Sequence, residues 1–495
     1  TAAAHYLPAL MEASATRLPL VVLTANRPPE LHGTAANQTT AQEHLFGRYV
    51  RVFVDLGVGD APAAKAALRQ GAQAAAAARH PLPGPVHLDL RARKPLEPGA
   101  TPAEPGAPPR HHLPVLTPSP GGLAAFAADC AGAERGVLAA GPQRVTPALR
   151  EAAMAFVQAT GFTLLADVTS GLRGLPGAVP GFDALLKSDG GREALAADVL
   201  VQLGAPPVGA GWLRYAAVPR SAFWTLGTHP LPDRFPDAGG AATDVLVGEP
   251  AAALRAACDG FEPPALTGPE AAEAPRGERL RALLEREAAR LARPYGEAHV
   301  ARAAVDALPA GGALVLGNSL PVRLADAFAP PKDVRVVSQR GVSGIDGLIA
   351  GAAGFATATK TPTLLLLGDV AALHDVGALV LAARATTPLV VLVVDNAGGR
   401  IFDLLPVRAW AEAAGRGAER ERFFAMAGAP SLEGAARMAE LPYVRCDGAE
   451  ALAKALADAL ARPGASLVHA RVAPESGVTA LRALEGAAAE GVRGS

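Results

Sequence analysis

The sequence has little of several residue types that mark particular protein classes. Only 3 of its 495 residues are cysteine, and aromatic residues make up 4% of the chain. Cys130, Cys258 and Cys446 lie far apart, form no C-x-x-C pair and are odd in number, which indicates a reducing compartment rather than a disulfide framework. We therefore expect three small, buried thiols in a cytoplasmic protein.

Charge of one sign and long apolar runs are also missing. The 46 basic and 47 acidic residues give a net charge of −1, which argues against a nucleic-acid or membrane partner. No run of 18 uncharged apolar residues occurs, because Asp369, His374 and Asp375 interrupt the most hydrophobic region. No signal-peptide pattern is visible in the first residues. The remaining class is a globular protein, long enough for about three domains.

The strongest pattern lies in the stretch Thr363–Pro406. Two short apolar runs, Thr363–Leu367 and Pro388–Val394, have the length and the Val/Leu content of buried strands. Between them, Ala371–Arg384 has helical spacing and helix-forming residues. The stretch therefore predicts a β-α-β unit of a parallel sheet.

Each of these strands is followed by a polar cluster. Asp369 follows the first strand and Asn396 the second, 27 positions later, so both side chains should meet at the ligand-binding edge of the sheet. Gly398 permits a backbone carbonyl to turn inward as a third oxygen donor, and such a set suits Mg²⁺ that also holds a diphosphate. A single Gly-Asp after a strand is more often a turn or a helix cap, so the second cluster is what favours a site.

This pattern resembles the Mg-diphosphate motif of thiamine diphosphate enzymes. The surrounding residues are similar to one branch of that family, the 2-succinyl-5-enolpyruvyl-6-hydroxy-3-cyclohexene-1-carboxylate synthases (MenD) of menaquinone biosynthesis. The similar segments are GNSLPVR at 317–323, QRGVSGIDGL at 339–348, GDVAALHD at 368–375, NAGGRIFDLLP at 396–406, LTANRPPEL at 23–31 and AANQTT at 35–40. The resemblance runs nearly end to end and is weakest between Pro95 and Glu287.

The resemblance and the alternation of helix and strand imply an α/β fold with three doubly wound parallel-sheet domains of the thiamine diphosphate-enzyme type. The expected parts are a pyrimidine-binding domain at 1–94, a Pro-rich linker at 95–115, a central α/β domain at 116–267, a connecting helix at 268–294 and a diphosphate- and metal-binding domain at 295–495. Expected strands include Leu18–Thr24, Pro85–Leu90, Gly136–Ala140, Phe162–Ala166 and Val199–Gly204, and expected helices include Thr1–Ala15, Ala61–Arg79 and Gly268–Arg293, the last after a turn at Phe261–Pro264.

The first domain is expected to be incomplete, because the helix at Thr1 has no strand before it. The family's glutamate that contacts the aminopyrimidine ring is expected upstream of Thr1, and Glu12, Glu30 and Glu43 do not match its motif. We therefore expect the chain as it stands to bind its cofactor weakly and to form product slowly or not at all.

The resemblance implies thiamine diphosphate and Mg²⁺ as cofactors, with Mn²⁺ as an alternative metal. The implied catalytic residues are Arg27, Gln38, Ser319, Arg323 and Arg340, and the implied cofactor-binding residues are Ser343, Gly344, Ile345, Gly368, Asp369, Val370, Asn396, Gly398, Gly399, Ile401 and Phe402, with Asp369, Asn396 and Gly398 also binding the metal. Without the resemblance, each arginine would be interpreted as a surface residue, and Ile345, Ile401 and Phe402 could equally be core residues.

The implied reaction is decarboxylation of 2-oxoglutarate and conjugate addition of the succinyl unit to isochorismate, in a homodimer or tetramer. Both substrates carry two carboxylates, which explains the need for arginine forks.

One departure from the family pattern is Ala210-Gly211, where the family usually has an adjacent basic pair; either Arg214 takes over or one carboxylate is held less tightly. The alternatives are another thiamine diphosphate 2-oxoacid lyase, such as an acetolactate synthase-like enzyme, or a non-catalytic truncated paralogue.

Overall fold

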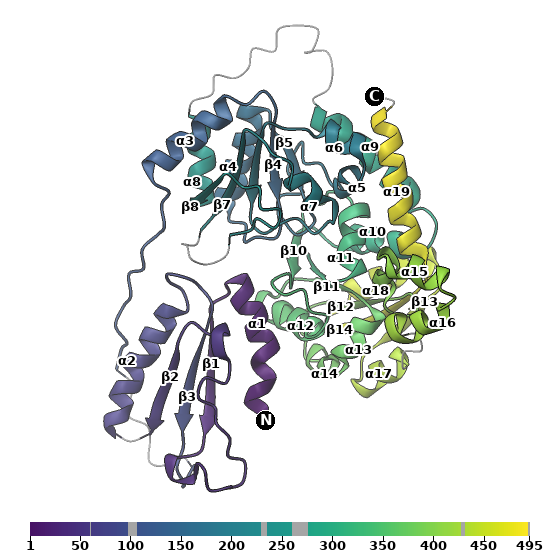
Figure 1. Ribbon diagram of the computed structural model, residues 1–495. Helices are drawn as coiled ribbons and strands as arrows, with labels where there is room; N and C mark the ends of the chain where they lie inside the picture. The colour runs from purple at the N-terminus through teal and green to yellow at the C-terminus, as the bar shows by residue number, and fades with distance from the viewer. Residues whose placement is uncertain (60, 98–105, 229–234, 260–275, 427–430, 494–495) are drawn as a thin grey trace. The chain divides into compact units, whose positions relative to one another are not determined.

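The computed structural model describes residues 1–59, 61–97, 106–228, 235–259, 276–426 and 431–493. Its contacts divide the chain into two units (Figure 1). The first unit comprises residues 1–116 together with the short segment Gln339–Ser343, and the second comprises most of the remainder. The predicted turn at Phe261–Pro264 and the beginning of the predicted helix at Gly268–Arg293 lie outside the described residues, as does part of the Pro-rich linker.

The first unit contains a three-stranded parallel sheet in the order β1-β3-β2. Its elements are β1 (Leu20–Asn26), β2 (Phe53–Val58), β3 (Pro85–Arg91), α1 (Leu7–Thr16) and α2 (Ala61–Ala77). The predicted strand at Leu18–Thr24 begins two residues later, because Arg17 is left-handed (φ 59°) and Pro19 has no N–H to donate. Strand β2 was not predicted from the sequence, since Asp55 and Gly57 weaken its strand pattern.

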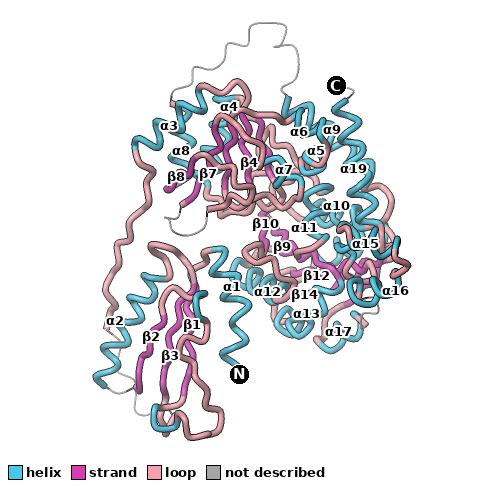
Figure 2. Tube along the Cα trace, viewed as in Figure 1, coloured by secondary structure: helices cyan, strands magenta, loops and turns pink. Residues whose placement is uncertain are grey.

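The second unit contains two larger parallel sheets. The central sheet has the order β5-β4-β6-β7-β8 and carries helices on both faces (Figure 2). Its elements are β4 (Gly136–Ala140), β5 (Thr163–Ala166), β6 (Val199–Leu203), β7 (Ala222–Gly227), β8 (Asp244–Val247), α3 (Pro120–Ala131), α4 (Pro147–Thr160), α5 (Asp183–Leu186), α6 (Asp189–Ala194), α7 (Gly211–Ala216) and α8 (Pro250–Cys258). Leu138 and Ala140 pack toward α3, α4 and α8, and Val137 and Ala139 pack on the opposite face, as the two-residue period of a strand requires.

The C-terminal sheet has the order β10-β9-β11-β12-β14-β13. Its strands are β9 (Ala313–Leu316), β10 (Arg335–Ser338), β11 (Thr363–Gly368), β12 (Leu389–Asp395), β13 (Tyr443–Cys446) and β14 (Ala465–Arg471). The remaining helices are α9 (Arg276–Leu291), α10 (Glu297–Ala307), α11 (Leu320–Phe328), α12 (Leu348–Thr359), α13 (Asp369–His374), α14 (Leu379–Ala382), α15 (Val407–Ala413), α16 (Gly417–Arg420), α17 (Leu432–Met438), α18 (Ala449–Leu460) and α19 (Ser476–Arg493).

The β-α-β prediction is confirmed in its strands and wrong in its helix. Strands β11 and β12 pair in parallel, with Gly368 opposite Val394. The predicted continuous helix at Ala371–Arg384 is instead broken into α13 and α14, separated by a short 3-10 turn. The break occurs at Asp375 (φ −125°), whose Oδ2 accepts a hydrogen bond from Ala350 N at 2.9 Å and caps α12.

One hydrophobic core joins the two sheets of the second unit. It includes Val137 and Leu200 from the central sheet, Leu314 and Leu366 from the C-terminal sheet, and apolar side chains of α9, α10, α11, α18 and α19. The α/β class with parallel sheets is therefore confirmed, whereas the exact domain boundaries stay a prediction. Among the described residues, no helix is both long enough and apolar enough to cross a membrane.

Candidate functional site

The carboxyl edge of the C-terminal sheet brings together three polar segments from different parts of the chain. The chain leaves β9 for β10 on one side, whereas β11 lies on the other side, so the strand order reverses between β9 and β11. In open parallel sheets ligands bind at such a reversal, outside the carboxyl ends of the strands. Gly317 follows β9 and donates its N–H to Leu366 O on β11 at 2.8 Å. The site is built around this edge.

Asp369 follows β11 and is 2% exposed. Its Oδ1 accepts the N–H of Val370 at 2.8 Å, and its Oδ2 accepts the N–H of Gly398 at 2.7 Å. Gly368 forms the N-cap of α13 just before it. Burial raises the pKa of Asp369, and the nearby Asp395 carboxyl adds to this rise. A buried carboxylate in these surroundings would be stabilised by a bound cation.

Asn396 and Gly398 lie in the loop that follows β12. Asn396 is 5% exposed, and its Oδ1 accepts no hydrogen bond from any residue that the structure describes. Gly398 has a φ of 115°, a conformation that a side chain would strain, so glycine is required there. A buried amide oxygen without a donor is the kind of group that a metal ion satisfies.

The donor set fits a hard cation. The described residues contain no cluster of three or more His, Cys, Asp or Glu that could hold a metal. A metal here would thus depend on one carboxylate, one amide oxygen and one backbone carbonyl, those of Asp369, Asn396 and Gly398. Such a set leaves open positions for the oxygens of a diphosphate and suits Mg²⁺ or Mn²⁺.

Arg400 supports this loop and was not predicted from the sequence. It is 7% exposed, and its guanidinium donates to Asn396 O at 3.3 Å and to Ala397 O at 3.0 Å. Its charge is balanced by Glu421 at 2.8 Å. Gly399 donates its N–H to Ala425 O at 2.6 Å, which ties down the same loop. The motif Gly-Gly-Arg in this loop was the signal that could have indicated Arg400.

Glu297 was also missed. It opens α10, is 2% exposed, and lies close to the side chain of Asn396. Its Oε1 accepts the N–H of Gly477 at 3.2 Å. Burial raises the pKa of Glu297 to about 7, although the neighbouring Asn396 side chain and the N–H of Gly477 oppose the rise. From the sequence alone, Glu297 cannot be distinguished from an exposed glutamate in the first turn of a helix, where its charge interacts favourably with the helix dipole.

The loops after β9 and β10 meet beside this centre. Asn318 donates its Nδ2–H to Gly344 O at 2.6 Å. Ser319 has a φ of 72°, and its carbonyl accepts a hydrogen bond from Arg323 Nη1 at 2.7 Å. Ile345 is partly buried against the core formed by α12 and β11. These contacts place Ser319, Gly344 and Ile345 on one connected pair of loops.

A cavity of about 440 Å³ in the second unit is lined by residues of α5, α7, α11 and α19 and of the loops beside them. Of the predicted residues, Arg323 and Ile401 line it, whereas Asp369 and Asn396 do not. Phe402 lies next to Ile401 and its ring contacts Phe424 at a centroid distance of 5.4 Å. The cavity therefore extends away from the metal-binding loop rather than surrounding it.

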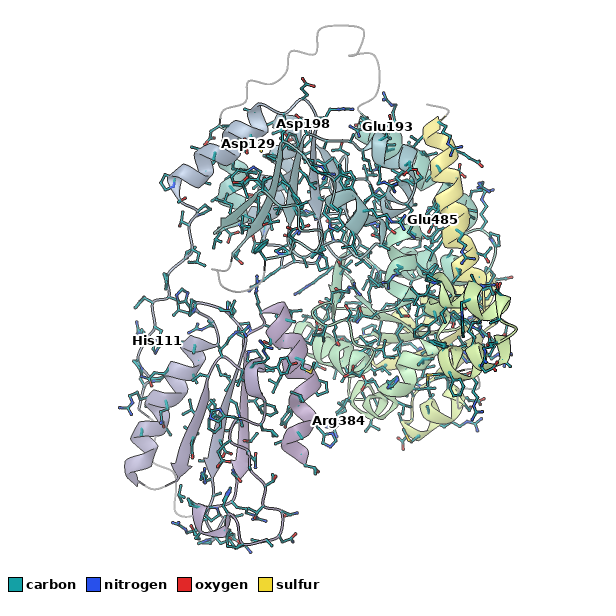
Figure 3. All side chains as sticks on the ribbon, viewed as in Figure 1. His111, Asp129, Glu193, Asp198, Arg384 and Glu485 are labelled. Atoms are coloured by element: carbon teal, nitrogen blue, oxygen red, sulfur yellow. The ribbon has the colours of Figure 1, made fainter. Side chains whose placement is uncertain are left out.

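The departure at Ala210-Gly211 lies in the wall of the same cavity. Gly211 donates its N–H to Asp183 Oδ1 at 2.7 Å, and a Cβ at Gly211 would lie 2.9 Å from that oxygen. A larger residue is therefore excluded by packing. Arg214, on the same helix, also lines the cavity, as does Glu485 of α19, which is labelled in Figure 3 and forms an ion pair with Lys187.

The remaining predicted residues belong to the first unit. Arg27 follows β1, and its Nη2 donates to Gln38 Oε1 at 3.0 Å, so these two lie together. Arg340 and Ser343 lie in the segment Gln339–Ser343, and Ser343 has a φ of 58°. Within the same unit, Glu12 accepts the N–H groups of Gly341 and Val342, each at 2.8 Å.

The other two glutamates considered from the sequence are engaged in ion pairs. Glu30 pairs with Arg93 at 2.6 Å, and Glu43 pairs with Arg91 at 2.6 Å. The guanidinium of Arg91 helps to lower the pKa of Glu43, after the backbone hydrogen bond that contributes most to the shift. These carboxylates therefore stabilise the first unit locally.

Comparisons with known proteins agree with this geometry. Residues 319–470 match the family model described as thiamine pyrophosphate enzyme, C-terminal TPP binding domain. A 2-succinyl-5-enolpyruvyl-6-hydroxy-3-cyclohexene-1-carboxylate synthase of Sorangium cellulosum is 39% identical, over 98% of this chain and 83% of that protein. The synthase of Halorhodospira halophila is 36% identical, over 96% and 82% of the two chains. The crystal structure of benzoylformate decarboxylase from Polynucleobacter necessarius has a TM-score of 0.67 at 16% identity, covering 94% of this chain and 84% of that one.

Proposed function

We propose a specific reaction for this chain, which belongs to the 2-succinyl-5-enolpyruvyl-6-hydroxy-3-cyclohexene-1-carboxylate synthase family of thiamine diphosphate-dependent transferases. The reaction is the decarboxylation of 2-oxoglutarate followed by conjugate addition of the succinyl unit to isochorismate. Two features at the carboxyl edge of β11 and β12 carry the proposal. Buried Asp369 accepts the N–H of Gly398, and the loop after β12 also holds Asn396, whose buried Oδ1 is unsatisfied among the described residues.

The metal-binding loop would anchor the cofactor. Asp369, Asn396 Oδ1 and the Gly398 carbonyl would hold Mg²⁺, or Mn²⁺ in its place, and the metal would neutralise a diphosphate. When bound, thiamine diphosphate supplies the electron sink that makes loss of CO₂ from a 2-oxo acid possible. The neighbouring Gly344, Ile345, Gly399 and Phe402 would define the walls around it.

The cationic residues would bind the substrates. Arg323 lines the cavity, and its guanidinium can bind a carboxylate bidentately. We also propose Arg27, Gln38 and Arg340 as substrate-binding residues, because the resemblance to the family implies that role. Two dicarboxylate substrates need several such groups, whereas a lyase for mono-acids would not. Arg214 in the cavity wall favours the interpretation that it replaces the basic pair missing at Ala210-Gly211.

Apolar residues would keep water from the reacting atoms. Ile401 is half-buried, lines the cavity and packs against the core that joins the two sheets. A dry wall next to the guanidinium of Arg323 strengthens its attraction for a carboxylate, because fewer water dipoles screen the charge. The chain's own groups thus bind, orient and desolvate the substrates.

The proposal is tested by product analysis with the purified protein, thiamine diphosphate and Mg²⁺. Because turnover is expected to be slow, the assay follows long incubations, and we expect whatever 2-oxoglutarate is consumed to be consumed only when isochorismate is present, with the succinylated adduct detected by mass spectrometry. Pyruvate in place of 2-oxoglutarate serves as the matched mono-acid control and should give no product. Equal use of pyruvate, or CO₂ release without an adduct, would favour a different thiamine diphosphate lyase.

A further inference from the structure

A row of buried polar side chains crosses strands β1 and β3 of the first unit. Thr24 lies opposite Asp89 in the register of these strands, and Asn26 lies two residues further along the same face of β1. His87 lies two residues before Asp89 on the same face of β3. The exposed fractions of Thr24, Asn26 and Asp89 are 5%, 6% and 0%. Buried polar groups destabilise a fold unless they form hydrogen bonds, so their partners indicate what the row does.

Asp89 accepts a hydrogen bond at each of its carboxylate oxygens. The hydroxyl of Thr24 donates to Oδ1 at 3.1 Å, and Nδ2 of Asn26 donates to Oδ2 at 2.7 Å. Thr24 Oγ1 also lies 2.8 Å from Nε2 of His87, whose ring contacts that of Phe46 at a centroid distance of 4.7 Å. Asp89 is therefore held by Thr24 on one side and meets the amide of Asn26 on the other.

The orientation of the Asn26 amide follows from its second partner. Its Oδ1 accepts the N–H of Arg27 at 2.8 Å. A backbone N–H can only donate, so the end of the amide that faces Arg27 must be the oxygen, and the NH₂ group must face Asp89. The pairing of β1 with β3 ends at Asn26, so the side chain supplies an acceptor to the first N–H beyond the strand.

We propose that Asp89 is a positioning residue that fixes Arg27 through Asn26. This inference rests on the proposed function, because Arg27 is a substrate-binding residue only in that proposal. Asp89 holds the amide of Asn26, and the amide holds the main chain of Arg27. Because Arg27 precedes Pro28, its backbone is also restricted to extended conformations. From this fixed main chain the guanidinium extends to Gln38 Oε1 at 3.0 Å.

The first test is Asp89→Asn, which keeps the shape of the side chain. The Thr24 hydroxyl still needs an acceptor, so the new amide turns its NH₂ group toward the NH₂ group of Asn26. Either the two groups repel or Asn26 rotates, and in both cases Arg27 N–H loses a well-placed acceptor. We expect hydrogen exchange at the Arg27 amide, followed by mass spectrometry with fragmentation, to become about 10-fold faster.

A binding measurement connects this change to the site. Glutarate is a suitable probe, because it is a dicarboxylate without the 2-oxo group and cannot be decarboxylated. In the presence of thiamine diphosphate and Mg²⁺, its affinity, measured by calorimetry, should fall about 10-fold in Asp89→Asn. Asp55→Asn is the control, since the Asp55 side chain belongs to the same sheet but is 38% exposed. It should change neither the affinity nor the exchange at Arg27.

A polarity exchange tests the hydrogen bond itself. In the double variant Asn26→Asp with Asp89→Asn, the new amide at position 89 can donate to the new carboxylate at position 26. The other oxygen of that carboxylate remains for the N–H of Arg27. We expect this variant to recover most of the protection at Arg27 and most of the glutarate affinity. A purely structural role for Asp89 predicts no recovery, because two substitutions then disturb the same buried row.

A double-mutant cycle tests whether the effect passes through Arg27. Asp89→Asn should lower glutarate affinity no further in a protein that already carries Arg27→Ala, whereas a general loosening of the sheet would add to the loss. Wild-type glutarate affinity in Arg27→Ala would remove Arg27 from the proposed function, while exchange at Arg27 in Asp89→Asn would still test the positioning.

The remaining outcomes concern Asp89 alone. If folded Asp89→Asn keeps both the wild-type exchange at Arg27 and the wild-type glutarate affinity, the role of Asp89 is overturned and the proposed function stands. If Asp89→Asn does not fold, the polarity exchange decides. It should fold and protect the Arg27 amide, and its failure to do so overturns the inference.

Discussion

At the scale of single residues, the metal-binding loop depends on positions that tolerate no close substitute. Gly398 has a φ of 115°, and Asn396 has a buried side-chain oxygen that accepts no hydrogen bond from the described residues. An Asp at position 396 would add a second buried carboxylate to a loop that already contacts Asp369, and a Ser would be too short. The residue types in this loop are therefore fixed by hydrogen bonding and backbone conformation together.

Arg323 gives a prediction at the same scale. Arg323→Ala should lower kcat/KM by the equivalent of roughly 2–5 kcal/mol, because a carboxylate would lose its partner in a desolvated cavity. Thiamine diphosphate affinity, measured by calorimetry, should change little. Arg384→Ala is the matched control, since Arg384 is exposed (Figure 3). Wild-type kcat/KM in Arg323→Ala for both substrates would contradict the assignment.

Sequence reasoning found the residues that directly follow strands and missed those that act from other elements. Asp369 and Asn396 could be predicted because each ends an apolar run, and parallel strands align their carboxyl ends. Glu297 lies about 100 positions before Asn396 on a helix whose start carries no unusual pattern. Its place beside the proposed site arises only from packing of α10 and α19 against the sheet, which local spacing does not encode.

At the scale of elements, a buried charge cluster joins the loop after β5 to α11. Asp326 Oδ1 accepts the N–H of Val168 at 2.8 Å and pairs with Arg173 Nη1 at 3.2 Å. Burial raises the pKa of Asp326 to about 7; the charge of Asp167 adds to the rise and that of Arg173 opposes it. Desolvation is thus the main cost of this connection between the two sheets.

The raised pKa predicts a pH-dependent stability. Between about pH 4 and 7 the folded protein keeps a proton on Asp326 that the unfolded chain has released, so stability falls as the pH rises through this range. The apparent melting temperature of Asp326→Asn should therefore fall less with rising pH than that of the wild type.

Asp333→Asn is the control, because the Asp333 side chain is 79% exposed. Parallel pH profiles of the wild type and Asp326→Asn would show that this carboxyl does not titrate in the range. Part of the slope should persist even in Asp326→Asn, because burial also raises the pKa of Asp167.

Prediction of helices from the sequence failed where a side chain ends its own helix in order to cap another one. The segment Ala371–Arg384 has good helix formers throughout, yet Asp375 leaves the helix to cap α12. Capping satisfies N–H groups that would otherwise lack a partner, and the gain outweighs the local preference. By contrast, β4 was predicted to the residue, because its apolar run Gly136–Ala140 is bounded by turns and buried on both faces.

At the scale of the whole molecule, the second unit contains both the proposed metal-binding residues and the cavity. Its two sheets share one hydrophobic core, and helices α5, α7, α11 and α19 contribute to the cavity that Arg323 and Ile401 line. Short continuous runs of Val and Leu, which alternate along the chain with helical segments, predicted the parallel α/β class. Strands that are covered on both faces need apolar residues at successive positions. The division into exact domains could not be tested by the same reasoning, since it depends on packing between elements rather than on their patterns.

The central claim is that Asp369, Asn396 and Gly398 bind a divalent metal that holds thiamine diphosphate. It is tested most directly by calorimetric titration of thiamine diphosphate into wild-type protein and Asp369→Ala, with and without Mg²⁺. The wild type should bind only with Mg²⁺, and Asp369→Ala should lose at least about 100-fold in affinity, because the proposed set then has no carboxylate. Asp333→Ala should behave as the wild type. Unchanged, Mg²⁺-dependent affinity in folded Asp369→Ala would contradict the account.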